Sequence, residues 1–179
     1  MNWPNRLTIL RVIMIPFFVA FMLTDIGGVN SKYIALAIFV IASMTDWLDG
    51  YLARKHNIVT NFGKFMDPLA DKLLVCSAMI CLIPLSRIPT VAVLIIIGRE
   101  FIISGFRLVA SDNGIVIAAS YWGKLKTVSQ MVMIILLIAD FGGIFTTIET
   151  IFVWLATILT VISLVDYIFI NKKVLRMQD

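Results

Sequence analysis

The sequence predicts an all-α membrane protein, with six transmembrane helices in one bundle and a single domain over residues 1–179. Of its 179 residues, 60% are hydrophobic and 15% are charged, whereas a soluble domain has about 45–50% apolar and about 25% charged residues. Six apolar segments are each long enough to cross a bilayer, which takes about 20 residues. Glycine and proline fall between these segments, so the connections are short and neighbouring helices are expected to be antiparallel.

In chain order, the predicted spans cover residues 8–27, 32–54, 67–85, 88–110, 121–140 and 146–170. The first span follows NWPNRLTILR and has no small-residue cleavage site, so we expect it to remain as a helix. The second is the run YIALAIFVIASM, and the polar stretch TDWLDGYLARK closes it. Pro68 and Pro89 lie near the starts of the third and fourth spans, where a missing backbone N–H costs little. The fifth follows ASYWGKLK, and the sixth is apolar except for a few residues such as Asp166.

The basic residues alternate with the apolar segments and indicate the topology. The side predicted to be cytoplasmic carries Arg6, Arg11, Arg54, Lys55, Lys64, Arg107, Lys124, Lys126, Lys172, Lys173 and Arg176. The other side carries little beyond Lys32 and Arg87. Because Lys and Arg favour cytoplasmic loops, both termini are predicted to be cytoplasmic. This bias also accounts for the net charge of +4, so no nucleic-acid partner is predicted.

The cysteines and the one histidine do not predict a zinc or redox site. Cys76 and Cys81 lie five residues apart in an apolar run, a spacing unlike that of metal or redox motifs. We expect both to be small core residues.

Four aspartates flank the connection between the second and third spans. Asp46 and Asp49 share an arc of about 100° on one helix, and Asp67 and Asp71, four apart, share a face of the next. The chain turns back between the two pairs, so they can converge. Carboxylates so close together repel, and divalent cations such as Mg²⁺, Mn²⁺ or Ca²⁺ would resolve that conflict. A paired metal site implies a phosphate-bearing substrate.

A purely structural interpretation of these aspartates is also open. Asp67 could cap a helix beside Pro68, and the others could form salt bridges with Arg54, Lys64 or Lys72. This interpretation suits one aspartate better than four on converging faces.

The spacing of these residues is D-x-x-D-G-x-x-A-R, eight residues, then G-x-x-x-D-x-x-x-D. It resembles the signature of the CDP-alcohol phosphatidyltransferase family at every fixed position. The resemblance implies a six-helix, usually dimeric bundle in the cell membrane, with its active site at the cytoplasmic face. There a CDP-activated diacylglycerol would give its phosphatidyl group to an alcohol and release CMP.

The resemblance also implies roles for single residues. Two divalent ions, Mg²⁺ or Mn²⁺, would be held on the pyrophosphate by Asp46, Asp49, Asp67 and Asp71. Asp71 is similar to the proposed general base of the family. CDP-diacylglycerol would be contacted by Asn5, Thr8, Asp46, Asp49, Gly50, Arg54 and Thr60. For the N-terminal residues, which share an arc with Arg11, a solvated and snorkelling helix start is an equal alternative.

Several cations are predicted near this centre and suggest an anionic acceptor. The candidates for binding the acceptor's phosphate are Arg99, Arg107, Lys124 and Lys126. Charged residues at membrane depth usually face a cavity, although Glu100 could form an internal ion pair, for instance with Lys72. Lys124 and Lys126 point about 160° apart on a helix. Either the helix begins after them or only one faces the site, the other anchoring to anionic lipid.

GREFIISGFR and ASYWGKLKTVSQ also resemble the branch of the family that uses sn-glycerol 3-phosphate, the phosphatidylglycerophosphate synthases. That acceptor is therefore predicted, with transfer to inositol phosphate as the alternative within the family. From other classes, two alternatives remain: a divalent-cation or proton-coupled transporter, in which Asp166 could extend the ion path inward, and a purely structural or interaction protein. The transporter is disfavoured because the acids cluster at one face and no inverted repeat is visible.

Overall fold

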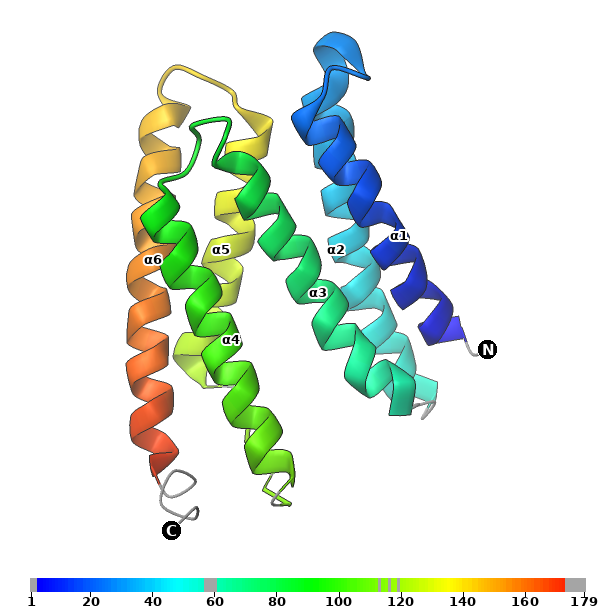
Figure 1. Ribbon diagram of the computed structural model, residues 1–179, viewed down its shortest axis with the longest axis vertical. Coiled ribbons are helices and arrows are strands. Elements are labelled where there is room, and N and C mark those ends of the chain that lie inside the picture. The colour runs from blue at the N-terminus through cyan, green and yellow to red at the C-terminus, as the bar shows by residue number, and fades with distance from the viewer. Residues whose placement is uncertain (1–2, 57–60, 113, 116, 119, 173–179) are drawn as a thin grey trace. The chain divides into compact units, whose positions relative to one another are not determined.

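The computed structural model describes residues 3–56, 61–112, 114–115, 117–118 and 120–172, and within them not the side chains of 3–6, 46–56, 61–65 and 67. These residues form six α-helices and one short 3-10 helix (Figure 1). Each of the six predicted segments corresponds to one α-helix. The chain divides into two compact units, residues 1–87 with 137–139 and residues 88–136 with 140–179. That the chain forms a single domain stays a prediction.

The first unit contains α1 (Trp3–Leu23), the 3-10 helix η1 (Gly28–Asn30), α2 (Ser31–His56) and α3 (Asn61–Leu82). Helix α1 packs against both α2 and α3, and α2 also contacts α3 (Figure 1). Phe18 and Phe39 are fully buried where α1 meets α2, with ring centroids 5.9 Å apart. Leu74 and Met79 of α3 are also fully buried. The core of this unit is therefore a contact of three apolar helix faces.

Helix α1 ends at Leu23, four residues before the predicted end, because the chain turns at a pair of glycines. Gly28 has a φ of +57°, a left-handed conformation that favours glycine. A Cβ added at Gly27 would lie 2.9 Å from the Cα of Ser31, so the close approach of these two residues requires glycine there. The hydroxyl of Ser31 lies 2.7 Å from the carbonyl oxygen of Phe21 and binds that free end of α1. The first connection is thus a compact, hydrogen-bonded turn.

Helix α3 begins at Asn61, six residues before the predicted start, so Pro68 lies inside the helix. The first turns of α3 mix apolar residues with Asn61, Lys64 and Asp67, so a prediction based on continuous apolar runs does not include them. This start places Asp67 in the seventh position of α3, where it cannot cap the helix N-terminus. The capping interpretation of Asp67 is therefore wrong.

The second unit contains α4 (Thr90–Asp112), α5 (Tyr121–Ala139, as far as Leu136) and α6 (Phe145–Ile170). Helices α4 and α6 lie side by side and run in the same direction (Figure 1). Ser120 caps α5, since its side chain accepts a hydrogen bond of 3.2 Å from the backbone N–H of Gly123. The cap shows that α5 begins before Lys124 and Lys126.

Three helical segments within the described residues are long and apolar enough to cross a membrane: Gly28–Thr45, Tyr121–Ala139 and Phe145–Ile170. Helix α6 is apolar outside and partly polar inside. Its exposed side carries Ile151, Trp154, Leu155, Ile158, Val161, Ile162, Val165 and Phe169. Its buried side includes Thr157, Thr160 and Ser163. An exposed apolar face of this size is typical of a helix that contacts lipid.

Candidate functional site

The backbone places the two aspartate pairs at matching depths on α2 and α3. Asp46 lies ten residues before the end of α2 at His56, and Asp71 lies ten residues after the start of α3 at Asn61. Asp49 and Asp67 lie seven and six residues from the same ends. At about 1.5 Å per residue, each outer aspartate is roughly 15 Å from the turn. Since α2 and α3 pack together, the register brings the two pairs level with each other.

The side chains of three of these aspartates lie outside the described residues. Asp71 is described and is partly buried. No cluster of three or more His, Cys, Asp or Glu side chains that could hold a metal ion occurs among the side chains that the structure describes. The four aspartates offer only carboxylate oxygens, which are the ligands that hard divalent cations take. By its chemistry, the donor set fits Mg²⁺ or Mn²⁺.

Two polar residues of α1, Thr8 and Arg11, are buried in the first unit. Thr8 and Arg11 each have an exposure of 1%. The Nε of Arg11 donates a hydrogen bond of 3.2 Å to the carbonyl oxygen of Ala42, one turn before Asp46 on α2. The start of α1 is therefore not solvated at these two positions, unlike in the snorkelling alternative. The side chains of Asn5, Gly50 and Arg54, and the whole of Thr60, lie outside the described residues.

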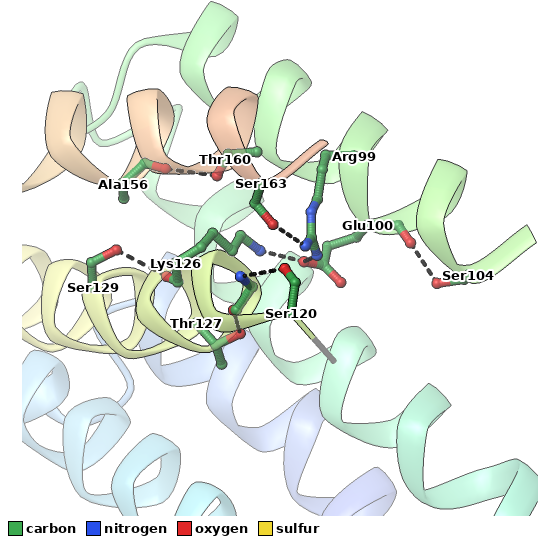
Figure 2. Close-up of polar contacts among 11 residues, drawn as sticks. Arg99, Glu100, Ser104, Ser120, Lys126, Thr127, Ser129, Ala156, Thr160 and Ser163 are labelled. Atoms are coloured by element: carbon green, nitrogen blue, oxygen red, sulfur yellow. Dashed lines mark hydrogen bonds and ion pairs between the residues drawn. The ribbon is translucent and has the colours of Figure 1, made fainter. Parts of the chain in front are cut away.

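A charged cluster joins α4, α5 and α6 in the second unit (Figure 2). The carboxylate of Glu100 pairs with the ammonium of Lys126 and, at 3.2 Å, with the guanidinium of Arg99. Arg99 also donates a hydrogen bond to the hydroxyl of Ser163 on α6. Arg99 and Lys126 have exposures of 8% and 1%. These three side chains, two cations and one carboxylate, together carry one net positive charge.

The neighbouring lysines of α5 point to different sides, as their predicted angular separation requires. Lys126 is buried, whereas Lys124 is exposed. The structure thus brings Lys126, and not Lys124, together with Arg99. At Gly123, an added Cβ would lie 3.4 Å from Nη2 of Arg99 and 3.7 Å from Oγ of Ser163. Only a side chain no larger than a methyl group leaves room for the cluster there.

The fourth acceptor candidate, Arg107, is exposed and lies two turns beyond Arg99 on α4. Its guanidinium carbon is 5.9 Å from the ring centroid of Tyr167 on α6, within range of a cation–π contact. Arg107 and Arg99 therefore both contact α6, at Tyr167 and at Ser163.

Sequence reasoning did not identify Ser163 or Tyr167 as candidates. The signal was present, because Ser163, Asp166 and Tyr167 are spaced i, i+3 and i+4 in an otherwise apolar helix, and such positions share one face. The sequence does not show which face of α6 packs on α4, so this spacing alone could not connect Ser163 or Tyr167 with Arg99.

Comparison with known proteins agrees with the signature. Residues 1–162 match the model of the CDP-alcohol phosphatidyltransferase family. The chain is 40% identical to a Bacillus subtilis protein over 98% of this chain and 97% of that one. It is 41% identical to a Haemophilus influenzae protein, over 96% and 94% of the two chains. It is 38% identical to a Rickettsia typhi protein, over 93% and 94%.

All three relatives are named CDP-diacylglycerol–glycerol-3-phosphate 3-phosphatidyltransferase. The fixed aspartate signature, the helical membrane architecture and the match over most of the chain lead to one conclusion. This protein belongs to the CDP-alcohol phosphatidyltransferase family, whose members generally use divalent metal ions.

Proposed function

We propose that this protein transfers the phosphatidyl group of CDP-diacylglycerol to sn-glycerol 3-phosphate, producing phosphatidylglycerophosphate and CMP. The observation that carries the proposal is the aspartate signature, whose two pairs lie at matching depths on α2 and α3. The names of the near-full-length relatives support the same donor and acceptor.

In the proposed reaction, a hydroxyl oxygen of the acceptor attacks the phosphorus that carries the diacylglycerol. A new P–O bond forms, the P–O bond to CMP breaks, and the acceptor hydroxyl loses its proton. Asp71 would take this proton, since a carboxylate held next to the hydroxyl can act as a general base. When bound, two divalent ions would neutralise the pyrophosphate and the leaving CMP.

The first unit would bind the donor. Asp46, Asp49, Asp67 and Asp71 would hold the metal ions, as their spacing and all-oxygen chemistry suggest. CDP would be contacted by Asn5, Thr8, Gly50, Arg54 and Thr60. The burial of Thr8 and Arg11 supports a role of α1 within the interior of this unit.

The second unit would bind the phosphate of the acceptor. Glycerol 3-phosphate carries about two negative charges near pH 7, and the cluster of Arg99, Lys126 and Glu100 has one net positive charge. Arg107, at the exposed end of α4, would add a second guanidinium. Choline or ethanolamine, as cations, would not need these groups.

The proposal also includes the membrane topology, the metal, the surrounding lipids and the oligomeric state. Six helices would span the cytoplasmic membrane, with both termini and the active site on the cytoplasmic side, as the distribution of Lys and Arg suggests. Mg²⁺ or Mn²⁺ would be the metal, membrane lipids would surround the apolar helix faces, and a homodimer is expected from the family resemblance.

The test is CMP release by purified protein in detergent micelles that contain CDP-diacylglycerol and Mg²⁺. We expect CMP release only when glycerol 3-phosphate is added, together with one equivalent of phosphatidylglycerophosphate. Preference for inositol phosphate or serine would contradict the acceptor but leave the phosphatidyl transfer intact. No CMP release with any alcohol would contradict the transfer itself.

A further inference from the structure

The C-terminal third of α6 carries three polar side chains on one face. Ser163 and Tyr167 have exposures of 0% and 2%, and Asp166 is partly buried. In a 26-residue helix that is otherwise mostly apolar, buried polar side chains usually have a function.

The buried hydroxyls earlier in α6 are satisfied within the helix. Thr157 donates a hydrogen bond to the carbonyl oxygen of Val153 at 2.7 Å. Thr160 donates one to the carbonyl oxygen of Ala156 at 2.6 Å, as Figure 2 shows. Ser163 accepts a hydrogen bond from Arg99 on α4. The hydroxyls of these three residues therefore have clear structural partners.

Three other polar atoms near this face have no such partner among the described residues. The hydroxyl of Tyr167, Oδ2 of Asp166 and Nε of Arg99 are buried, and no hydrogen-bond partner for them occurs within the described part of the chain. Buried polar atoms are normally paired, because leaving them unpaired forfeits their interactions with water. Together the three atoms offer donors and acceptors to a ligand with several polar groups.

Packing holds these atoms close to both arginines of α4. The ring of Phe106 contacts the ring of Tyr167 edge-on, with centroids 6.2 Å apart and an interplanar angle of 89°. The guanidinium of Arg107 lies on the same tyrosine ring, and Arg99 contacts α6 one turn earlier, at Ser163. Because α4 and α6 run in the same direction, Asp166 and Tyr167 lie within about a helical turn of both arginine contacts.

We propose that Tyr167 and Asp166 bind the hydroxyl of the acceptor that does not react, and so select a phosphorylated polyol. The proposal rests on the proposed function, in which Arg99 and Lys126 bind the acceptor's phosphate. The secondary hydroxyl of glycerol 3-phosphate donates a hydrogen bond to the carboxylate of Asp166 and accepts a hydrogen bond from the phenol of Tyr167. No covalent bond changes in this step, which only orients the acceptor.

The experiment compares two acceptors that differ by one hydroxyl. Glycerol 3-phosphate has the reacting primary hydroxyl, the secondary hydroxyl and the phosphate, whereas 3-hydroxypropyl phosphate lacks the secondary hydroxyl. We expect the wild-type enzyme to prefer glycerol 3-phosphate by roughly ten- to a hundredfold in kcat/KM, because a site built for a hydroxyl leaves polar groups unpaired without it.

Two variants then remove the proposed contacts. Tyr167→Phe removes only the phenol oxygen, and Asp166→Ala removes the carboxylate. Each should lower kcat/KM for glycerol 3-phosphate and leave that for 3-hydroxypropyl phosphate nearly unchanged, so the preference shrinks toward one. Tyr33→Phe, at a half-exposed position of α2, is the matched control and should keep the full preference.

Three results would overturn the proposal. The first is equal use of both acceptors by the wild-type enzyme. The second is an equal loss of activity with the two acceptors in both variants, which would indicate a structural role only. If the wild-type enzyme used neither acceptor but released CMP with another alcohol, the acceptor assignment and this proposal would fall together. Only the last result would also contradict the proposed function, so the two failures are distinguishable.

Discussion

Asp71 lies in the third turn of α3 and is partly buried. Asp71→Asn keeps the shape of the side chain but removes the carboxylate that we propose as the proton acceptor and as a metal ligand. We expect turnover to fall by about two orders of magnitude or more, the usual scale for general acid–base catalysis. The measurement is kcat with both substrates saturating, combined with CDP-diacylglycerol binding. Wild-type turnover in this variant would mean that another group is the base.

The two lysines at the start of α5 allow a matched comparison at the residue scale. Lys126 is buried beside Arg99 and pairs with Glu100, whereas Lys124 is exposed. Lys126→Ala should raise KM for glycerol 3-phosphate by about tenfold or more and change KM for CDP-diacylglycerol much less. Lys124→Ala should have a small effect on both constants.

Steady-state kinetics over both substrates, with thermal unfolding in detergent as a check on folding, would test this difference. Equal effects of the two substitutions would argue against an acceptor site at the buried cluster. The comparison is informative because the two residues differ mainly in which side of α5 they occupy.

At the scale of the elements, the turn between α1 and α2 depends on one glycine. A Cβ at Gly27 would lie 2.9 Å from the backbone of Ser31 and 3.0 Å from the side chain of Ile34. Gly27→Ala should therefore reduce stability by about 1–3 kcal/mol, the usual cost of overpacking. At Gly105 on α4 an added Cβ meets nothing within 4 Å, so Gly105→Ala should be neutral or stabilise by up to about 1 kcal/mol.

Thermal unfolding of the two alanine variants in the same detergent would measure this contrast. If Gly27→Ala unfolded at the same temperature as the wild-type protein, the turn would have to accommodate the added Cβ at little cost in free energy. The two positions show that a glycine's role depends on its neighbours and not on its place in an apolar segment.

At the scale of the whole molecule, activity should depend on bound metal. EDTA should reduce turnover at least a hundredfold without unfolding the helices, and excess Mg²⁺ or Mn²⁺ should restore it, because we propose that the four aspartates hold divalent cations. Asp46→Asn should lower turnover even with metal present, since it removes one proposed ligand. Full turnover in chelator would rule out the two-metal site.

Much of the fold could be predicted from the order of the residues alone. The helix boundaries agree within two residues for α2, α4, α5 and α6, since apolar runs bounded by glycine and proline determine where a membrane helix can lie. The predicted bounds of α1 and α3 differ from the structure by three to six residues at each end. A glycine turn ends the first helix early, and both helices begin in mixed polar and apolar segments that precede their apolar runs.

The sequence alone was also enough to predict that each aspartate pair shares one face of α2 or α3, because this follows from helical periodicity and chain connectivity. The partners of the buried charged side chains, in contrast, could be identified only from the tertiary structure. Glu100 could have paired with any nearby cation, but its carboxylate meets Lys126 and Arg99. Likewise, Tyr167 meets Arg107 only because α4 and α6 lie side by side. Periodicity determines which residues share a face, whereas the packing of helices determines what that face contacts.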